Sequence, residues 1–66
     1  MNAILKYRQD HALTQEQLAE QLGITKASIC RFERGERKPS VKRVDEITKI
    51  TGIPRHELRP DIWEAA

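Results

Sequence analysis

A single residue, Ile24, separates two helix-end signals near the middle of this chain. Gly23 directly follows a helical pattern, and glycine in that place supplies the left-handed backbone that closes a helix. Thr25 is a residue type that begins helices as an N-cap. The two helices on either side must therefore be joined by a turn of about three residues, so their axes cross sharply.

Before that turn the sequence predicts two helices. The first is expected over residues 2–12, and the second is expected to begin at Thr14 and to end at Gly23. Thr14 starts a capping box, because its hydroxyl can accept from the backbone of Gln17 while the Gln17 side chain reaches back. The residues that follow helical spacing are Ile4, Leu5, Arg8 and Ala12 in the first helix and Leu18, Ala19 and Leu22 in the second.

The third helix is expected over residues 26–34. Its inner face is narrow, because Ile29 and Phe32 are the apolar residues spaced to point toward a core. Gly35 ends this helix and opens a basic loop that runs to Pro39. The outer face of the helix is small, polar and basic, and consists of Lys26, Ala27, Ser28 and Arg31.

Two further helices are predicted beyond that loop. Ser40 caps a fourth helix that Gly52 ends, and a short fifth helix covers residues 53–58 until the Arg59-Pro60 pair interrupts it. The buried stripe of the fourth helix is expected to contain Val41, Val44, Ile47 and either Ile50 or Thr51. The expected architecture is an all-α bundle of four to five helices around one core, because 66 residues cannot supply two.

Composition limits the location and chemistry of the protein. The longest apolar run, Ala3 to Leu5, is too short for a membrane span or a secretory signal, so a cytoplasmic protein is expected. The single cysteine, Cys30, excludes an internal disulfide, and the two histidines are far apart in the sequence. No catalytic triad pattern, glycine-rich phosphate loop or metal-ligand spacing is present. The sequence therefore predicts no enzyme activity, catalytic residue, metal, cofactor or small-molecule ligand.

Basic residues are concentrated in the centre of the chain. Residues 26–43 contain seven basic and two acidic side chains, a balance of +5, and the remainder must carry −3 because the whole chain carries +2. Such an uneven distribution is typical of a surface that faces a polyanion on a domain with a neutral or acidic back. The alternative is an ordinary solvated run of surface charge.

The residues around the turn also resemble a known family. Two short helices joined by a tight, glycine-containing turn, with an apolar inner face and a basic outer face, define a helix-turn-helix. The segments LTQEQLAEQLGIT (residues 13–25) and SICRFERG (residues 28–35) strongly resemble the lambda repressor and Cro (XRE-like) type of helix-turn-helix. The pattern continues through residues 37–40 and the fourth helix, and covers about fifty residues.

This resemblance implies a fold and a set of contacts with double-stranded DNA. The second helix would rest over the DNA backbone, and the third would lie in the major groove. The positions that match base-reading residues are Lys26, Ala27, Ser28 and Arg31. The positions that match phosphate-contacting residues are Gln15, Thr25, Arg37 and Lys38, with Arg43 close to them. Arg8 and Glu33 match a partly buried ion pair that ties the first helix to the third.

Side-chain chemistry supports the base-reading roles independently. Arg31 could bind the O6 and N7 atoms of a guanine with two hydrogen bonds, and Lys26 could reach a guanine or a phosphate. Ala27 could pack on the methyl group of a thymine. For each of these residues the alternative is a solvated position on the outside of a helix.

The chain departs from the common family pattern after Leu58. We therefore expect a helix-turn-helix DNA-binding domain over residues 1–58 and a C-terminal tail over residues 59–66. The tail contains Trp63, which must either fold back onto the core or bury itself against a partner. The candidate residues for a dimer interface are Leu58, Ile62 and Trp63.

The function expected from these features is sequence-specific DNA binding by a transcriptional regulator. The resemblance favours a Cro-like repressor that binds a palindromic operator as a homodimer, because one recognition helix reads only a few base pairs. One alternative is the antitoxin of a toxin–antitoxin pair, which would bind a toxin protein as well as its own operator. A second alternative is a helical module that binds only proteins and has no affinity for DNA.

Overall fold

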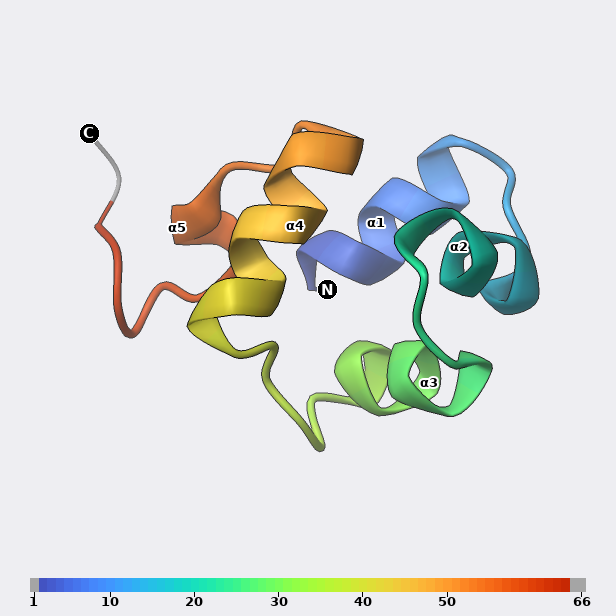
Figure 1. Cartoon of the computed structure of the whole chain (residues 1–66), viewed down its shortest axis with the longest axis horizontal. Coiled ribbons are helices and arrows are strands. Elements are labelled where there is room, and N and C mark those ends of the chain that lie inside the picture. Colours follow the sequence, from blue (N-terminus) through green and yellow to red (C-terminus); the bar gives the residue numbers. More distant parts are fainter. Residues whose placement is uncertain (1, 65–66) are drawn as a thin grey trace.

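The computed structural model describes residues 2–64 of the chain, and those residues form helices joined by short loops. The helices are α1 (Ala3–Asp10), α2 (Gln15–Leu22), α3 (Lys26–Arg34), α4 (Val41–Thr51) and α5 (Arg55–Leu58). Residues 2–64 contain no strand. The predicted all-α bundle is therefore confirmed. In Figure 1, α3 lies at one edge of the molecule, and α4 lies between α5 and the α2–α3 pair.

One hydrophobic core joins all five helices. Ile29 and Val44 are fully inaccessible to solvent, and Leu18 and Ile47 are almost so. The other buried apolar residues are Ile4, Ala19, Leu22, Phe32, Ile53 and Leu58. The core is made mostly of aliphatic side chains from every helix, and α3 packs within it chiefly against α2 and α1.

Side-chain caps define where the helices begin. Thr14 Oγ1 accepts a hydrogen bond from Gln17 N at 3.0 Å, and Gln17 Oε1 accepts one from Thr14 N at 2.9 Å, so the predicted capping box is present. Asn2 caps α1 by accepting from Leu5 N. Its amide nitrogen also donates to the carbonyl oxygens of Phe32 and Glu33, so Asn2 ties the start of α1 to the end of α3.

Three of the four longer helices end at the predicted glycines. Gly23, Gly35 and Gly52 follow α2, α3 and α4 with positive φ angles. The first helix is shorter than expected, because Ala12 adopts a φ of 53° and ends the helical path. Leu13 N then donates to Arg8 O at 3.0 Å, the bond that closes a helix through a left-handed residue. An alanine thus occupies a position that usually favours glycine.

The buried stripe of α4 is narrower than the sequence predicts. Val44 and Ile47 are buried, and Thr51 is half-buried, but Val41 is 50% exposed and Ile50 is 45% exposed. The prediction for Val41 was therefore wrong, and Thr51 rather than Ile50 completes the stripe. A helix turns by about 100° per residue, so Val41 and Ile50 lie at the two edges of a stripe that Val44, Ile47 and Thr51 define.

Residues 59–63 contact the bundle instead of extending from it. The backbone turns back after α5, because Ile62 N and Trp63 N both donate to Arg59 O. Trp63 is half-buried and packs against the core, with the guanidinium of Arg55 5.2 Å from its ring centre. The division into a domain (1–58) and a tail (59–66) stays a prediction, and residues 1, 65 and 66 lie outside the described residues.

Candidate nucleic-acid interface

The short turn between α2 and α3 packs the two helices directly against each other. Gly23, with a φ of 69°, ends α2, and Thr25 begins α3 by accepting from Ser28 N at 3.1 Å. Ile24 lies between them and packs against the core, which fixes the turn. The inner face of α3 is held by Ile29 and Phe32, as the sequence predicts, so its other side is left at the surface.

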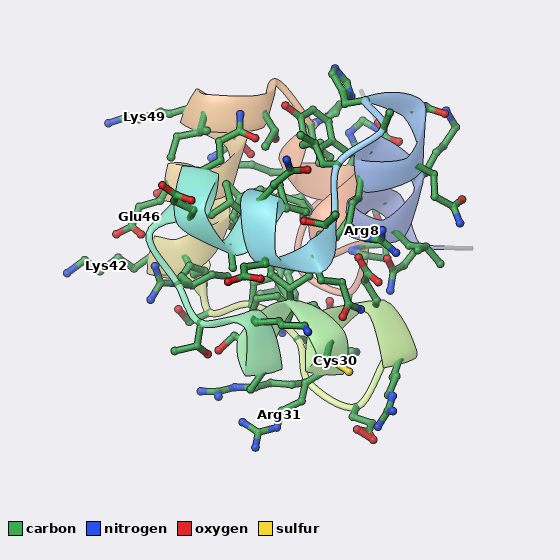
Figure 2. The ribbon with its side chains drawn as sticks, turned by 90° about the vertical axis from the view of Figure 1, so that its right-hand side faces the viewer. Arg8, Cys30, Arg31, Lys42, Glu46 and Lys49 are labelled. Atoms are coloured by element: carbon green, nitrogen blue, oxygen red, sulfur yellow. The ribbon has the colours of Figure 1, made fainter. Side chains whose placement is uncertain are left out.

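The outer face of α3 carries cations that have no salt-bridge partner in the described part of the chain. Lys26, Ala27 and Arg31 are all exposed. Neither Lys26 nor Arg31 forms a salt bridge with any residue between 2 and 64. Figure 2 shows Arg31 extending from α3 away from the rest of the molecule. These side chains are free to contact an anionic or hydrogen-bonding partner such as the edge of a base pair.

Ser28 differs from the other three predicted base-reading residues. It is half-buried, and its Oγ lies 2.9 Å from Thr25 Oγ1, so the two hydroxyls are already paired with each other. Thr25 is itself exposed at the start of α3. A hydroxyl has one donor and two acceptor sites, so each residue retains the capacity for at least one further hydrogen bond.

A network of charged and polar side chains links α3 to α1 and α2. Arg8 Nε donates to Glu33 Oε2 at 2.6 Å, and Gln15 Nε2 donates to Glu33 Oε1 at 2.9 Å. Arg8 also donates to the carbonyl oxygen of Leu13 at 3.0 Å. Figure 2 shows Arg8 turned into the molecule, in contrast to Arg31. The predicted ion-pair partners are thus in contact, and Gln15 supports α3 through the carboxylate of Glu33.

Burial and hydrogen bonding act in opposite directions on the pKa of Glu33. The side chain is only 7% exposed, and this burial alone would raise the pKa of the carboxyl group. The hydrogen bonds from Arg8 and Gln15, together with the charge of Arg8, outweigh burial and hold the pKa below its ordinary value. Glu33 is therefore ionised at neutral pH, and its charge is compensated inside the bundle.

A small cavity beside α3 is lined by the predicted phosphate-contacting cations. Its volume is about 150 Å³, and it lies between α3, the loop before α4 and the first turn of α4. The lining residues are Ile24, Ser28, Phe32, Arg37, Lys38, Pro39, Ser40 and Arg43. Three positive side chains around a mainly polar hollow form a site that would attract a phosphate group.

The three cations that line this cavity differ in whether a carboxylate already pairs with them. Arg37 is exposed and forms no salt bridge with any residue from 2 to 64. Arg43 donates to Glu46 at 2.9 Å within α4 and is half-buried. Lys38 Nζ lies 3.7 Å from Asp61 Oδ2. A phosphate would therefore meet Arg37 directly but would compete with a carboxylate for Lys38 and for Arg43.

The predicted dimer-interface residues occupy different environments. Leu58 belongs to the core of the single chain and is 9% exposed, so its role at an interface stays a prediction. It closes the bundle at the end of α5, where apolar contacts with the chain itself cover it. Ile62 is 45% exposed, and Trp63 is half-buried against the core. Of the three residues, Ile62 is the most exposed to solvent.

Two features of this region were missed by the sequence analysis. Asn2 caps α1 and also joins α1 to α3. The preference of asparagine for N-cap positions could have indicated the cap but not the contact with α3. Arg59 Nη1 donates to Pro39 O at 2.8 Å and so connects the segment after α5 to the basic loop. No spacing rule predicts a contact between residues twenty positions apart in two irregular segments.

The chain is similar to helix-turn-helix proteins over nearly its whole length. The family model described as helix-turn-helix matches residues 4–58. An uncharacterised HTH-type transcriptional regulator of Methanocaldococcus jannaschii is 40% identical over 57 residues, which cover 86% of this chain and 86% of that protein. An uncharacterised HTH-type transcriptional regulator of Methanothermobacter thermautotrophicus is 37% identical over 49 residues, covering 74% of this chain and 71% of its own.

A phage protein is also similar in sequence to this chain. The cryptic phage CTXphi transcriptional repressor RstR of Vibrio cholerae is 32% identical over 54 residues, which cover 82% of this chain but 49% of the repressor. No solved structure matches the chain significantly. Among the described residues, none of the helices has the length and apolar character needed to cross a membrane.

Proposed function

Because this chain belongs to the helix-turn-helix family of the lambda repressor-like type and is a DNA-binding transcriptional regulator, we propose that it is a Cro-like repressor that binds a palindromic operator as a homodimer. Its membership in this family makes it a regulator and not an enzyme. Repression would follow from occupancy of the operator, which blocks access of other proteins to the same DNA.

The observation that carries the proposal is the uncompensated charge on the outer face of α3. Lys26 and Arg31 point to solvent without a salt-bridge partner among residues 2–64, and the cavity beside them is lined by further cations. The major groove, about 12 Å wide, admits one helix, whose outer side chains can then reach base edges. We assign base contacts to Lys26, Ala27, Ser28 and Arg31.

Phosphate contacts would surround the helix and fix its register. Arg37, Lys38 and Arg43 border the cavity, and Thr25 and Gln15 lie at the N-termini of α3 and α2. Backbone amides at a helix N-terminus and positive side chains both favour a phosphate oxygen. Such contacts hold the protein on DNA of any sequence and leave discrimination to the base-reading side chains.

A homodimer would give the proposed operator its symmetry. One recognition helix reads few base pairs, and two related helices read half-sites about 34–36 Å apart. The RstR repressor of Vibrio cholerae, a relative of this chain, supports a repressive role. Ile62 offers an apolar side chain that is 45% exposed beside Trp63, where a second copy could cover it.

Selection of bound sequences from a random pool of DNA duplexes tests the proposal. We expect a consensus with two-fold symmetry, whose half-sites are separated by about one helical turn or a multiple of it. A consensus without symmetry would contradict the dimer, and the absence of any enriched sequence would contradict specific binding.

The interface is tested by sedimentation of Ile62→Asp. This variant is expected to be monomeric and to bind the full operator more weakly while keeping its affinity for a half-site. Ile50→Asp is the matched control, because Ile50 is equally exposed but lies on α4. If both variants sediment like the unmodified protein, Ile62 is not part of an interface.

A further inference from the structure

We infer that Arg59 is a positioning residue that holds the basic loop, and Lys38 in particular, against the proposed phosphate site. This inference rests on the proposed DNA-binding mode. Its basis is the contact between the segment after α5 and the loop that joins α3 to α4. That segment lies beyond residues 4–58, the part of the chain that the family model matches.

The basic loop has little structure of its own. Within residues 2–64, the backbone and side chains of residues 37–39 make a single hydrogen bond, which Pro39 O accepts from Arg59 Nη1 at 2.8 Å. The loop carries Arg37 and Lys38, so without this bond the ion pair of Lys38 with Asp61 would be the remaining polar restraint on residues 37–39 within residues 2–64. Pro39 is buried, but a segment with so few hydrogen bonds opens locally at a lower cost in free energy than a helix does.

Arg59 is well suited to restrain the loop, because its own orientation is fixed. Its Nε and Nη2 atoms donate to the two carboxylate oxygens of Asp61 at 2.9 and 2.7 Å. The side chain is only 18% exposed. The planar guanidinium can make this paired contact and still direct Nη1 toward Pro39, which the ammonium of a lysine cannot do.

Asp61 also brings a negative charge to the edge of the phosphate site. Its Oδ2 atom lies 3.7 Å from Lys38 Nζ, and the hydrogen bonds from Arg59 hold the pKa of Asp61 far below its ordinary value. The carboxylate therefore stays ionised and keeps Lys38 near the cavity wall that Pro39 forms. In the DNA complex a phosphate would take the place of this carboxylate as the partner of Lys38.

The test is a double-mutant cycle between Arg59 and Lys38, read as the salt dependence of DNA binding. Phosphate contacts do not depend on sequence, so a short mixed-sequence DNA duplex serves as the probe. The proteins compared are the unmodified chain, Arg59→Lys, Lys38→Ala and the double variant. Arg59→Lys retains the positive charge, so a change in the salt dependence of binding reports the geometry of the Arg59 contacts and not the loss of charge.

We expect Arg59→Lys to lower the affinity several-fold and to reduce the slope of log K against log salt by up to about one unit, the value of one phosphate contact. In the Lys38→Ala background the same substitution should have little further effect, because Lys38 is the residue through which Arg59 acts. Arg55→Lys is the control, since Arg55 is on α5 and contacts Trp63 instead of the loop.

The possible outcomes separate the inference from the proposed function. If the unmodified chain shows no salt-dependent binding to the duplex, the proposed DNA-binding mode fails. If the unmodified chain binds and Arg59→Lys keeps the same slope, or if the two substitutions are simply additive, the positioning role of Arg59 is overturned.

A second variant covers the case in which Arg59→Lys does not melt cooperatively. Arg59→Met keeps the aliphatic stem in its half-buried position and removes every donor, with Arg55→Met as the control for the lost charge. If Arg59→Met reduces the salt slope more than Arg55→Met does, the result supports the positioning role of Arg59. Equal slopes for the two variants contradict that role.

Discussion

Arg8 donates hydrogen bonds to both carboxylate oxygens of Glu33, from Nε to Oε2 at 2.6 Å and from Nη2 to Oε1 at 3.2 Å. Because the two residues belong to α1 and α3, this paired contact fixes the rotation of the proposed recognition helix relative to the rest of the bundle. Gln15 of α2 binds the same carboxylate, so Glu33 is the point at which three helices meet. The proposed base-reading face of α3 is therefore oriented by a residue whose own side chain is almost fully buried in the bundle.

Replacing Glu33 by alanine should destabilise the protein, because Arg8 and Gln15 lose a shared partner that is mostly shielded from water. We expect a loss of about 1–3 kcal/mol, the range for leaving hydrogen-bonding groups unpaired in a buried place. In a domain of this size each kcal/mol corresponds to a decrease in Tm of about 4–8 °C. Thermal melting followed by circular dichroism measures the shift. Glu20→Ala removes an exposed carboxylate of α2 and is the control; equal melting temperatures would show that the network adds no stability.

The same network makes a defined contribution to the pH dependence of stability. The pKa of Glu33 is lower in the folded chain than its ordinary value of 4.5, so folding favours the ionised form. The stabilisation is present above that ordinary value and is lost as the pH falls through the folded pKa. We expect the difference in unfolding free energy between the unmodified chain and Glu33→Gln to be constant near neutral pH and to shrink in acid. Urea titrations at several pH values measure it, and a difference that persists undiminished in acid would contradict the assignment.

Local signals predicted most of the fold, because they depend on neighbouring residues. The capping box at Thr14 and the left-handed glycine at Gly23 each involve atoms within a few residues of one another, and both are present. Ala12 carries no such signal, since alanine rarely adopts a positive φ, and the end of α1 was therefore placed too late. The environment of Leu58 depends on how α5 packs, which a pattern of apolar spacing does not specify.

Most of the candidate site could also be predicted, because it too depends on residues that are close in the sequence. The outer face of α3 follows from helical periodicity, so the exposure of Lys26 and Arg31 could be expected from their spacing alone. The pairing of Ser28 with Thr25 is a local detail that the cap position could have indicated. The contact of Arg59 with Pro39 arises only when the folded chain brings two irregular segments together, and no sequence period encodes it.

Arg31→Ala should relax the sequence specificity of DNA binding at one base pair of each half-site. The exposed guanidinium has no intramolecular partner among residues 2–64 and can make two hydrogen bonds to a guanine, which are worth about 1–3 kcal/mol of discrimination. Binding titrations over operator variants, each with one base pair changed, measure the effect. Arg34→Ala removes the same charge from the same helix, but Arg34 lies near Glu36, and its loss should leave the specificity profile unchanged. An unaltered profile for Arg31→Ala would remove this residue from base readout.

Ala12→Gly should stabilise the protein, in contrast to most substitutions of alanine by glycine. Ala12 is exposed and has a φ of 53°, a conformation that costs an alanine about 1–2 kcal/mol and a glycine almost nothing. The greater freedom of glycine in the unfolded chain offsets about 0.4–1 kcal/mol of this gain. The net expectation is an increase in unfolding free energy of up to about 1.5 kcal/mol and a rise in Tm of several degrees.

The reverse substitution at the end of α4 provides the matched control for Ala12→Gly. Gly52 has a φ of 79°, and an added Cβ would meet no atom within 4 Å, so Gly52→Ala imposes the backbone cost without a steric clash. It should lower the Tm by an amount similar to the gain from Ala12→Gly. If Gly52→Ala lowers the Tm while Ala12→Gly leaves it unchanged or lower, residue 12 does not hold the left-handed conformation in solution, and α1 continues beyond Asp10 as its apolar spacing predicts.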